Sequence, residues 1–166
     1  MDPYQQELQD CLPDLWRYAC ALCRDPDIAD DLVQDCAERA LNKRALWRPT
    51  GPLKPWLIKM LLNLHRSERR TYIRRSKLVP VVQVPDDAPD IDRLSPALDL
   101  NDTARAMSLL PSEQREALLT VVVGGLSYKD AAKALNIPIG TLMSRLGRAR
   151  ASLRTSLEHS AKEDTA

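Results

Sequence analysis

Residues 127–154 read SYKDAAKALNIPIGTLMSRLGRARASLR, the pattern of two helices separated by a short turn. Ser127 is a suitable N-cap for a helix over residues 128–135, which residues 136–138 (Asn-Ile-Pro) interrupt. A second helix opens at Gly140 and Thr141, and its apolar residues recur at i, i+4, i+7 and i+11. These residues are Leu142, Leu146, Ala149 and Leu153. The pattern predicts a helix-turn-helix, a common device for placing a helix in the major groove of DNA.

The second helix is basic on the side away from its apolar seam. Four polar residues point away from the seam and are the candidate groove-facing residues: Thr141, Ser144, Arg145 and Arg148. The alternative is an ordinary helical hairpin whose arginines are solvated. The turn, the seam and the basic outer face agree with one another, and together they favour DNA binding.

Charge is distributed in four blocks, although the net charge is only +1. Residues 1–38 carry ten acidic and two basic side chains (−8), and residues 39–77 carry one acidic and twelve basic ones (+11). Residues 78–126 total −5 and residues 127–166 total +3. Because each phosphate that Lys or Arg neutralises releases counterions, nucleic-acid binding follows local basic density. Two basic blocks therefore indicate two DNA contacts, and the acidic first block needs a different, basic partner.

The length and the periodicity indicate an all-α protein. At 166 residues the chain can bury one or two small helical cores, and no alternating strand pattern or internal repeat stands out. The N-terminus is acidic and lacks the apolar run of a signal peptide. No stretch approaches the roughly 20 apolar residues that span a bilayer, so membrane insertion is not expected. We expect a cytoplasmic protein.

All four cysteines fall in the first 36 residues: Cys11, Cys20, Cys23 and Cys36. The Cys-x-x-Cys spacing of Cys20 and Cys23 invites a zinc or redox interpretation. Both lie in a helical apolar pattern, however, and free cysteine is often a buried residue. We therefore expect core packing and no bound metal, with a thiol sensor as the alternative.

An acidic stripe follows the second predicted helix. The first helix keeps an amphipathic spacing from Leu8 to Leu22, and Asp25-Pro26 ends it and starts the next one. On that next helix one broad apolar face consists of Ile28, Leu32, Val33, Cys36, Ala37 and Ala40. Another face carries acids at i, i+4, i+8 and i+11: Asp27, Asp31, Asp35 and Glu38. Like charges at this spacing destabilise an isolated helix slightly, so the stripe favours a docking role over a merely solvated face.

The third predicted helix has an apolar seam on one side and a basic face on the other. The seam consists of Leu57, Met60, Leu61 and Leu64, and the opposite face of Lys59, Asn63, Arg66 and Arg70. Further cations follow at Arg69, Arg74, Arg75 and Lys77, with Tyr72 among them. Cations with an amide and an aromatic ring suit a strand of DNA, because amides read base edges and aromatic rings stack on bases. A solvated basic helix is the alternative.

The chain divides into a first helical domain over residues 1–78, a linker over residues 79–96, a second helical domain over residues 97–160 and a tail over residues 161–166. The linker segment contains four prolines and four aspartates, which is typical of a flexible, acidic linker. In the second domain, one helix with Leu98 and Met107 and another over residues 112–123 precede the helix-turn-helix. From Glu158 onward the sequence looks like a frayed end.

Three motifs occur in a fixed order along nearly the whole chain. Residues 30–35 read DDLVQD, and residues 55–64 read PWLIKMLLNL, followed by the arginines. Residues 110–117 read LPSEQREA, and residues 140–150 read GTLMSRLGRAR. In this order they resemble the polymerase-binding, −10 and −35 segments of bacterial sigma factors of the extracytoplasmic-function (ECF) type, group 4 of the sigma-70 family. Members of this class hold only the second and fourth conserved sigma regions.

The resemblance implies an alternative sigma factor that binds core RNA polymerase, recognises promoter DNA and is controlled by an anti-sigma factor, which would hold it in the cytoplasm or at the membrane. The β′ clamp helices and the β flap of core polymerase would be partners, and the polymerase-binding residues, which would dock on the clamp helices, would be Asp27, Asp30, Asp31, Gln34, Asp35 and Glu38. The −10 element would meet Lys59, Asn63, Arg66, Arg69 and Arg70, with Asn63 holding a flipped base. The −35 major groove would meet Thr141, Ser144, Arg145 and Arg148.

The chain departs from the family pattern at two positions. Met143 stands where many relatives carry a lysine or arginine, and Gly147 stands where a bulkier residue is frequent. No nucleophile–base pair, Gly-rich phosphate loop or carboxylate pair is evident, so we expect no enzyme, cofactor or small-molecule substrate. Two alternatives are a sigma-like decoy that sequesters an anti-sigma factor and a plain helix-turn-helix regulator with a helical ligand or dimer domain. The two basic blocks argue against the first, and the acidic stripe argues against the second.

Overall fold

The computed structural model describes residues 2–78, 102–163 and 165, and every regular element within them is a helix. In chain order the elements are α1 (Pro3–Cys23), α2 (Pro26–Asn42), the short 3-10 helix η1 (Arg44–Leu46), α3 (Lys54–Leu78), α4 (Asp102–Ser108), α5 (Ser112–Val122), α6 (Tyr128–Leu135) and α7 (Ile139–Glu163). The all-α prediction is confirmed. The predicted linker and the predicted start of the second domain, including Leu98, lie outside the described residues.

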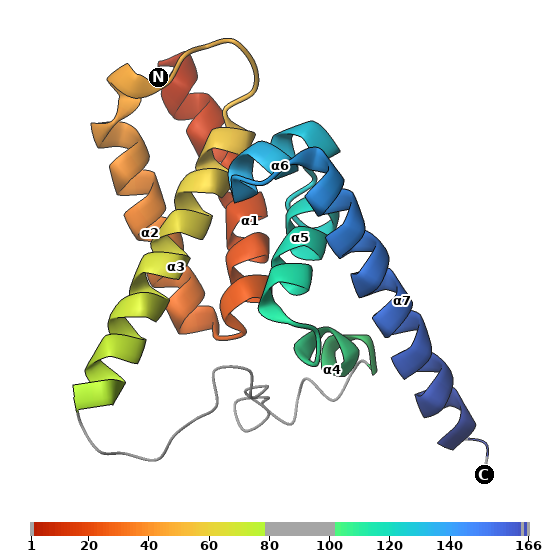
Figure 1. Ribbon diagram of the computed structural model, residues 1–166. Helices are drawn as coiled ribbons and strands as arrows, with labels where there is room; N and C mark the ends of the chain where they lie inside the picture. The colour runs from red at the N-terminus through yellow and green to blue at the C-terminus, as the bar shows by residue number, and fades with distance from the viewer. Residues whose placement is uncertain (1, 79–101, 164, 166) are drawn as a thin grey trace.

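Helices α1, α2 and α3 pack against one another and form the first unit (Figure 1). The Asp25 carboxylate accepts hydrogen bonds from the backbone N–H groups of Asp27 and Ile28, and Pro26 occupies the first turn, so α2 starts where the sequence predicted. Fully buried residues of the three seams include Leu15, Leu32, Leu57 and Leu61. The placement of Ile28 on the buried face was wrong, because its side chain is 36% exposed. It lies one residue, or about 100° of helix, before the buried Ala29.

Helix α1 fixes the start of α3 through two polar contacts. The Glu7 carboxylate accepts a hydrogen bond of 2.7 Å from the backbone N–H of Leu53, just before α3 begins. The Lys54 ammonium lies 2.7 Å from the Asp14 carboxylate, and the hydrogen bond it donates lowers the pKa of Asp14. These contacts set the entry of the helix that carries the predicted −10 residues.

Helices α4 to α7 form the second unit, and α6 and α7 form the predicted helix-turn-helix. The Ser127 hydroxyl accepts a hydrogen bond from the backbone N–H of Asp130, and Asn136 ends α6 in the left-handed conformation, with φ of 56°. Leu142, Leu146 and Ala149 are buried, as predicted. Helix α7 continues to Glu163. The prediction of a frayed end from Glu158 onward was therefore wrong for residues 158–163.

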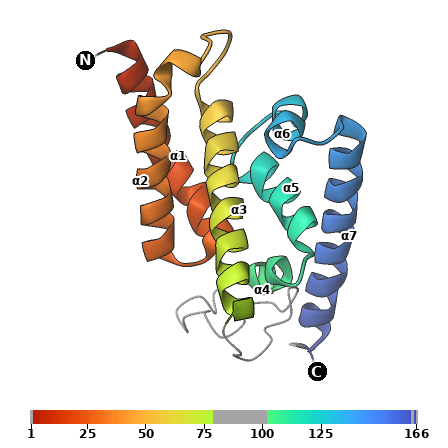
Figure 2. The same ribbon diagram turned by 60° about the vertical axis from the view of Figure 1, so that its left-hand side comes forward.

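The two units pack directly on one another, with α6 against α3 and α5 against α1 (Figures 1 and 2). Buried apolar residues from both units form one continuous cluster. Ile58 and Leu62, which lie outside the predicted seam of α3, are fully buried. Helix α3 is therefore buried on more than one side.

Candidate functional site

The acidic stripe lies on the exposed side of α2. Helix α2 turns Ala29, Leu32, Val33, Cys36 and Ala40 into the core. The six polar side chains predicted to contact polymerase are all exposed: Asp27, Asp30, Asp31, Gln34, Asp35 and Glu38. We call these six residues the acidic surface. Such a surface can attract a basic partner over a distance of about 8–10 Å at ordinary ionic strength.

Two residues from neighbouring helices extend the acidic surface. Trp16 of α1 is 43% exposed, and its indole N–H donates a hydrogen bond of 2.6 Å to the Asp30 carboxylate. Glu68 of α3 lies near the same carboxylates: partial burial raises the pKa of Glu68, and the charges of Asp35 and Asp31 raise it further. Neither residue was among those predicted from the sequence. Trp16 could have been identified from the sequence, because it is a large aromatic residue next to the buried Leu15 and lies on the polar side of α1.

The predicted −10 residues on α3 divide into two groups. Lys59, Asn63 and Arg70 are exposed, whereas Arg66 and Arg69 are half-buried. The Arg66 guanidinium lies 2.7 Å from the Glu116 carboxylate of α5, and the two side chains are only 29% and 14% exposed. The structure thus brings Arg66 to the junction of the two units and leaves Lys59, Asn63 and Arg70 facing outward.

His65 of α3 lies near the same junction, because the charges of Glu116 and Arg115 of α5 act on its imidazole. Its Nδ1 atom lies 3.8 Å from the Sγ atom of Cys23. Burial lowers the pKa of His65; the Glu116 carboxylate opposes this shift, and Arg69, Arg115 and Arg66 add to it. A neutral imidazole therefore suits this environment near pH 7.

The predicted −35 residues on α7 also divide. Ser144 and Arg148 are exposed, but Thr141 and Arg145 are half-buried. The Arg145 guanidinium lies 3.5 Å from the Glu113 carboxylate of α5. The outward face of α7 is therefore rotated relative to the predicted one.

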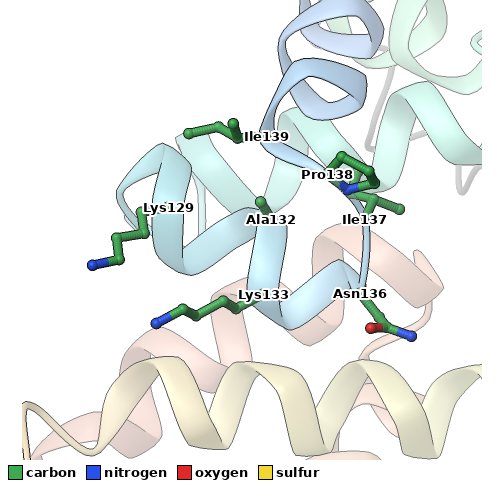
Figure 3. Close-up of a pocket in the computed structure, with 7 residues that line it drawn as sticks. All are labelled: Lys129, Ala132, Lys133, Asn136, Ile137, Pro138 and Ile139. Carbon is green, nitrogen blue, oxygen red and sulfur yellow. The ribbon is translucent and has the colours of Figure 1, made fainter.

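A hollow beside the turn of the helix-turn-helix is lined by Lys129, Ala132, Lys133, Asn136, Ile137, Pro138 and Ile139 (Figure 3). Lys129 and Lys133 stand one helical turn apart on α6 and extend to the same side. The lining residues include no acid, histidine, hydroxyl or thiol that could act as a base or activate a lysine, so the hollow offers cations for a phosphate.

All four cysteines lie in or against the core, as the sequence indicated. Burial raises the pKa of each thiol, to about 12 for Cys23 and for Cys36. Thiols with raised pKa values are poor nucleophiles and poor metal ligands at neutral pH. Within the part of the chain that the structure describes, no cluster of three or more His, Cys, Asp or Glu side chains is arranged to hold a metal. Over the same residues, none of the helices is both long and apolar enough to cross a bilayer.

Comparisons with known proteins match both units. A family model described as Sigma-70, region 4 matches residues 100–153, and one described as the Sigma2 domain of PhyR matches residues 8–62. The chain is 33% identical to the ECF RNA polymerase sigma factor EcfG of Rhodopseudomonas palustris over 98% of this chain and 90% of that protein. It is 32% identical to the ECF RNA polymerase sigma factor SigC of Mycobacterium tuberculosis, over 87% of this chain and 78% of that protein.

The fold across both units is also similar to that of solved structures. One of them contains the sigma factor RpoE of Bartonella quintana in complex with the anti-sigma factor NepR. The TM-score is 0.81 at 34% identity, and the match covers 95% of this chain and 98% of that one. The likeness therefore extends across both units.

Proposed function

Because the chain belongs to the ECF RNA polymerase sigma factors, we propose that it binds core RNA polymerase in the bacterial cytoplasm and directs it to a specific set of promoters. The observation that carries this proposal is the pairing of two surfaces in one chain. The exposed acidic surface lies on α2, which packs against α3, the helix with the basic face, and a helix-turn-helix follows. Phosphodiester synthesis belongs to the polymerase, so the chain itself is not an enzyme.

The acidic surface is the proposed docking site for the clamp helices of the polymerase β′ subunit. Its carboxylates offer charge complementarity to a basic partner, which accelerates association and fixes orientation. Trp16 adds a large, partly exposed aromatic ring held by Asp30. Aromatic anchors of this kind often supply much of the affinity at protein interfaces.

The exposed face of α3 is the proposed site for the −10 element. Asn63 would hydrogen-bond an unpaired base, and Lys59 and Arg70 would contact neighbouring phosphates. Extruding a base costs a few kcal/mol of stacking and pairing, which contacts to the extruded base must offset. Arg66 and Arg69 belong to the same proposed site, and Arg66 would have to leave Glu116 to reach DNA.

The outward face of α7 is the proposed site for the −35 element. Ser144 and Arg148 are exposed there, and Lys129 and Lys133 of α6 can contact the adjacent backbone. Thr141 and Arg145 remain part of the proposal, although Arg145 would have to leave Glu113.

We also propose that an anti-sigma factor controls the chain, in the cytoplasm or from the membrane. RpoE of B. quintana was crystallised with the anti-sigma factor NepR, and the likeness of this chain to RpoE spans both packed units. An anti-sigma factor that favours the packed arrangement would keep Arg66 at the junction and away from DNA.

Run-off transcription with purified core polymerase on a pool of genomic promoter fragments tests the proposed function. A sigma factor yields discrete transcripts that share −10 and −35 sequences. A decoy yields none and does not bind promoter DNA, whereas a plain helix-turn-helix regulator binds DNA without core polymerase and does not start transcripts. Either of the last two results would refute the proposal.

A further inference from the structure

The solvent-exposed face of α7 differs from the face predicted from the polar and charged residues of this helix. Leu142, Leu146 and Ala149 are buried and define the inward side of the helix. Arg145 lies beside this side, against Glu113. The outward positions over the same turns are Met143, Ser144, Gly147 and Arg148, all of them exposed.

Two of these outward positions are not polar. Met143 and Gly147 are four residues apart and share one edge of the helix, while Ser144 and Arg148 share the next edge. Met143 is 54% exposed, a large apolar side chain on the solvent side of a small protein. A Cβ atom built on Gly147 would meet no atom within 4 Å, so the surface beside Met143 is open. DNA can therefore approach the backbone of α7 closely at this point.

Base edges in the major groove include one apolar group, the C5-methyl group of thymine. The Met143 thioether has no strong hydrogen-bonding group, so it can distinguish base pairs in the groove only through contact with such a group. Ser144 and Arg148, on the adjacent edge, have hydroxyl and guanidinium groups for hydrogen bonds. Because Gly147 has no side chain, nothing at this position stands between this edge of the helix and the bases.

Resting on the proposed function, we propose that Met143 is a specificity-determining residue that reads the C5-methyl group of a thymine in the −35 element. Gly147 permits the close approach that this contact needs. Burying one methyl-sized group is worth about fourfold in affinity, since about 0.8 kcal/mol per CH₂ corresponds to that ratio. The contact thus tunes preference among promoters rather than determining whether the chain binds at all.

The test compares thymine with uracil, which lacks only the C5-methyl group. The full chain, assembled with core polymerase, first selects duplexes from a pool randomised over the −35 region. Each −35 thymine of a selected duplex is then replaced by deoxyuridine, one at a time, and the dissociation constants are measured. With the wild-type chain, we expect the replacement at one position to weaken binding about fourfold. The same replacement should have no effect with Met143→Ala or Met143→Gln, whereas Met143→Leu should keep the sensitivity.

Val122→Ala is the matched control, because Val122 is an exposed apolar residue that lies on α5 and not on the exposed face of α7. It should retain the wild-type sensitivity to the methyl group. A Met143→Ala variant that keeps this sensitivity would overturn the proposal, as would selected duplexes without a −35 thymine or with no methyl effect at any position. Failure to select any duplex would instead refute the proposed function, so the two failures are distinguishable. Since alanine is a good helix former, a thermal melt should show an intact Met143→Ala chain.

Discussion

The Tyr18 hydroxyl of α1 lies 2.9 Å from the Thr120 hydroxyl of α5, and both side chains are fully buried. Thr120 also donates a hydrogen bond of 2.6 Å to the backbone carbonyl of Glu116, so the proton between the two hydroxyls comes from Tyr18. This bond joins residues 102 positions apart in the chain and connects the two units. Together with the ion pair between Arg66 and Glu116, it is a specific polar contact at a junction that buried apolar residues also line.

Tyr18→Phe should lower the free energy of unfolding by about 1 kcal/mol, because the ring stays in place and one buried hydrogen bond is lost. Denaturant melts followed by circular dichroism measure this change. Tyr72→Phe, at an exposed position on α3, is the control and should leave the melt unchanged. Equal melts for wild type and Tyr18→Phe would show that the two hydroxyls contribute nothing to the packed state.

Glu116→Gln should make the two units separate more easily, because it removes the partner of Arg66 at the junction. The pair is partly buried, so we expect an effect of about 1 kcal/mol on the packing equilibrium. Single-molecule energy transfer between dyes on α2 and α7, titrated with salt, reports this equilibrium. The matched control is Glu113→Gln, since Glu113 is exposed and its partner Arg145 lies within the same unit. If both variants behave alike, the Arg66 pair does not hold the units together.

Asp31→Lys combined with Asp35→Lys should abolish or strongly weaken binding to core polymerase without unfolding the chain, because exposed charges seldom support a core. A pull-down with core polymerase and a thermal melt measure the two properties. A control with the same charge change, Asp10→Lys with Glu158→Lys, alters exposed acids away from α2 and should bind normally. If the folded α2 variant binds core polymerase as wild type does, the acidic surface is not part of the polymerase interface.

Stability should fall as the pH drops below about 6.5, because burial lowers the pKa of His65 from its reference value of 6.5. In this window the unfolded chain binds a proton at His65 more readily than the folded chain does, and protonation therefore favours unfolding. Denaturant melts at about pH 7.5 and pH 5.5 compare the two regimes. His65→Gln should flatten this dependence, whereas His159→Gln, on the exposed end of α7, should not. An equally steep decline with His65→Gln would assign the effect to other groups.

The features that were predictable from sequence depend on neighbours a few residues away. The cap at Ser127, the break at Asn136 and the seam from Leu142 to Ala149 all follow from helical periodicity and local hydrogen bonds. Likewise, the exposed acidic side of α2 follows from its apolar face. Ile58 and Leu62 were not placed in the core, because α3 packs against α6 of the second unit as well as against α1 and α2, and local periodicity does not show that extra contact.

The pairings across elements were not predictable for the same reason. Arg66 with Glu116 and Arg145 with Glu113 depend on how α5 packs against α3 and α7, and local patterns do not specify that packing. Both arginines belong to the predicted DNA-binding sets, so a sequence pattern that identifies cations does not show where they point. Met143 was visible as a departure from the family pattern, but its outward direction required the structure.

Permanganate reactivity of −10 thymines, in a promoter bound by core polymerase and this chain, shows whether α3 opens promoter DNA. The exposed face of α3 should hold the melted strand, so wild type should make these thymines reactive. Asn63→Ala should lose this reactivity while still binding the closed duplex through α7, and its thermal melt should be unchanged because Asn63 is exposed and alanine favours helix. Normal promoter opening by Asn63→Ala would exclude Asn63 from the −10 site, and an absence of opening by the wild-type chain on promoters that it binds would exclude α3 as the −10 site.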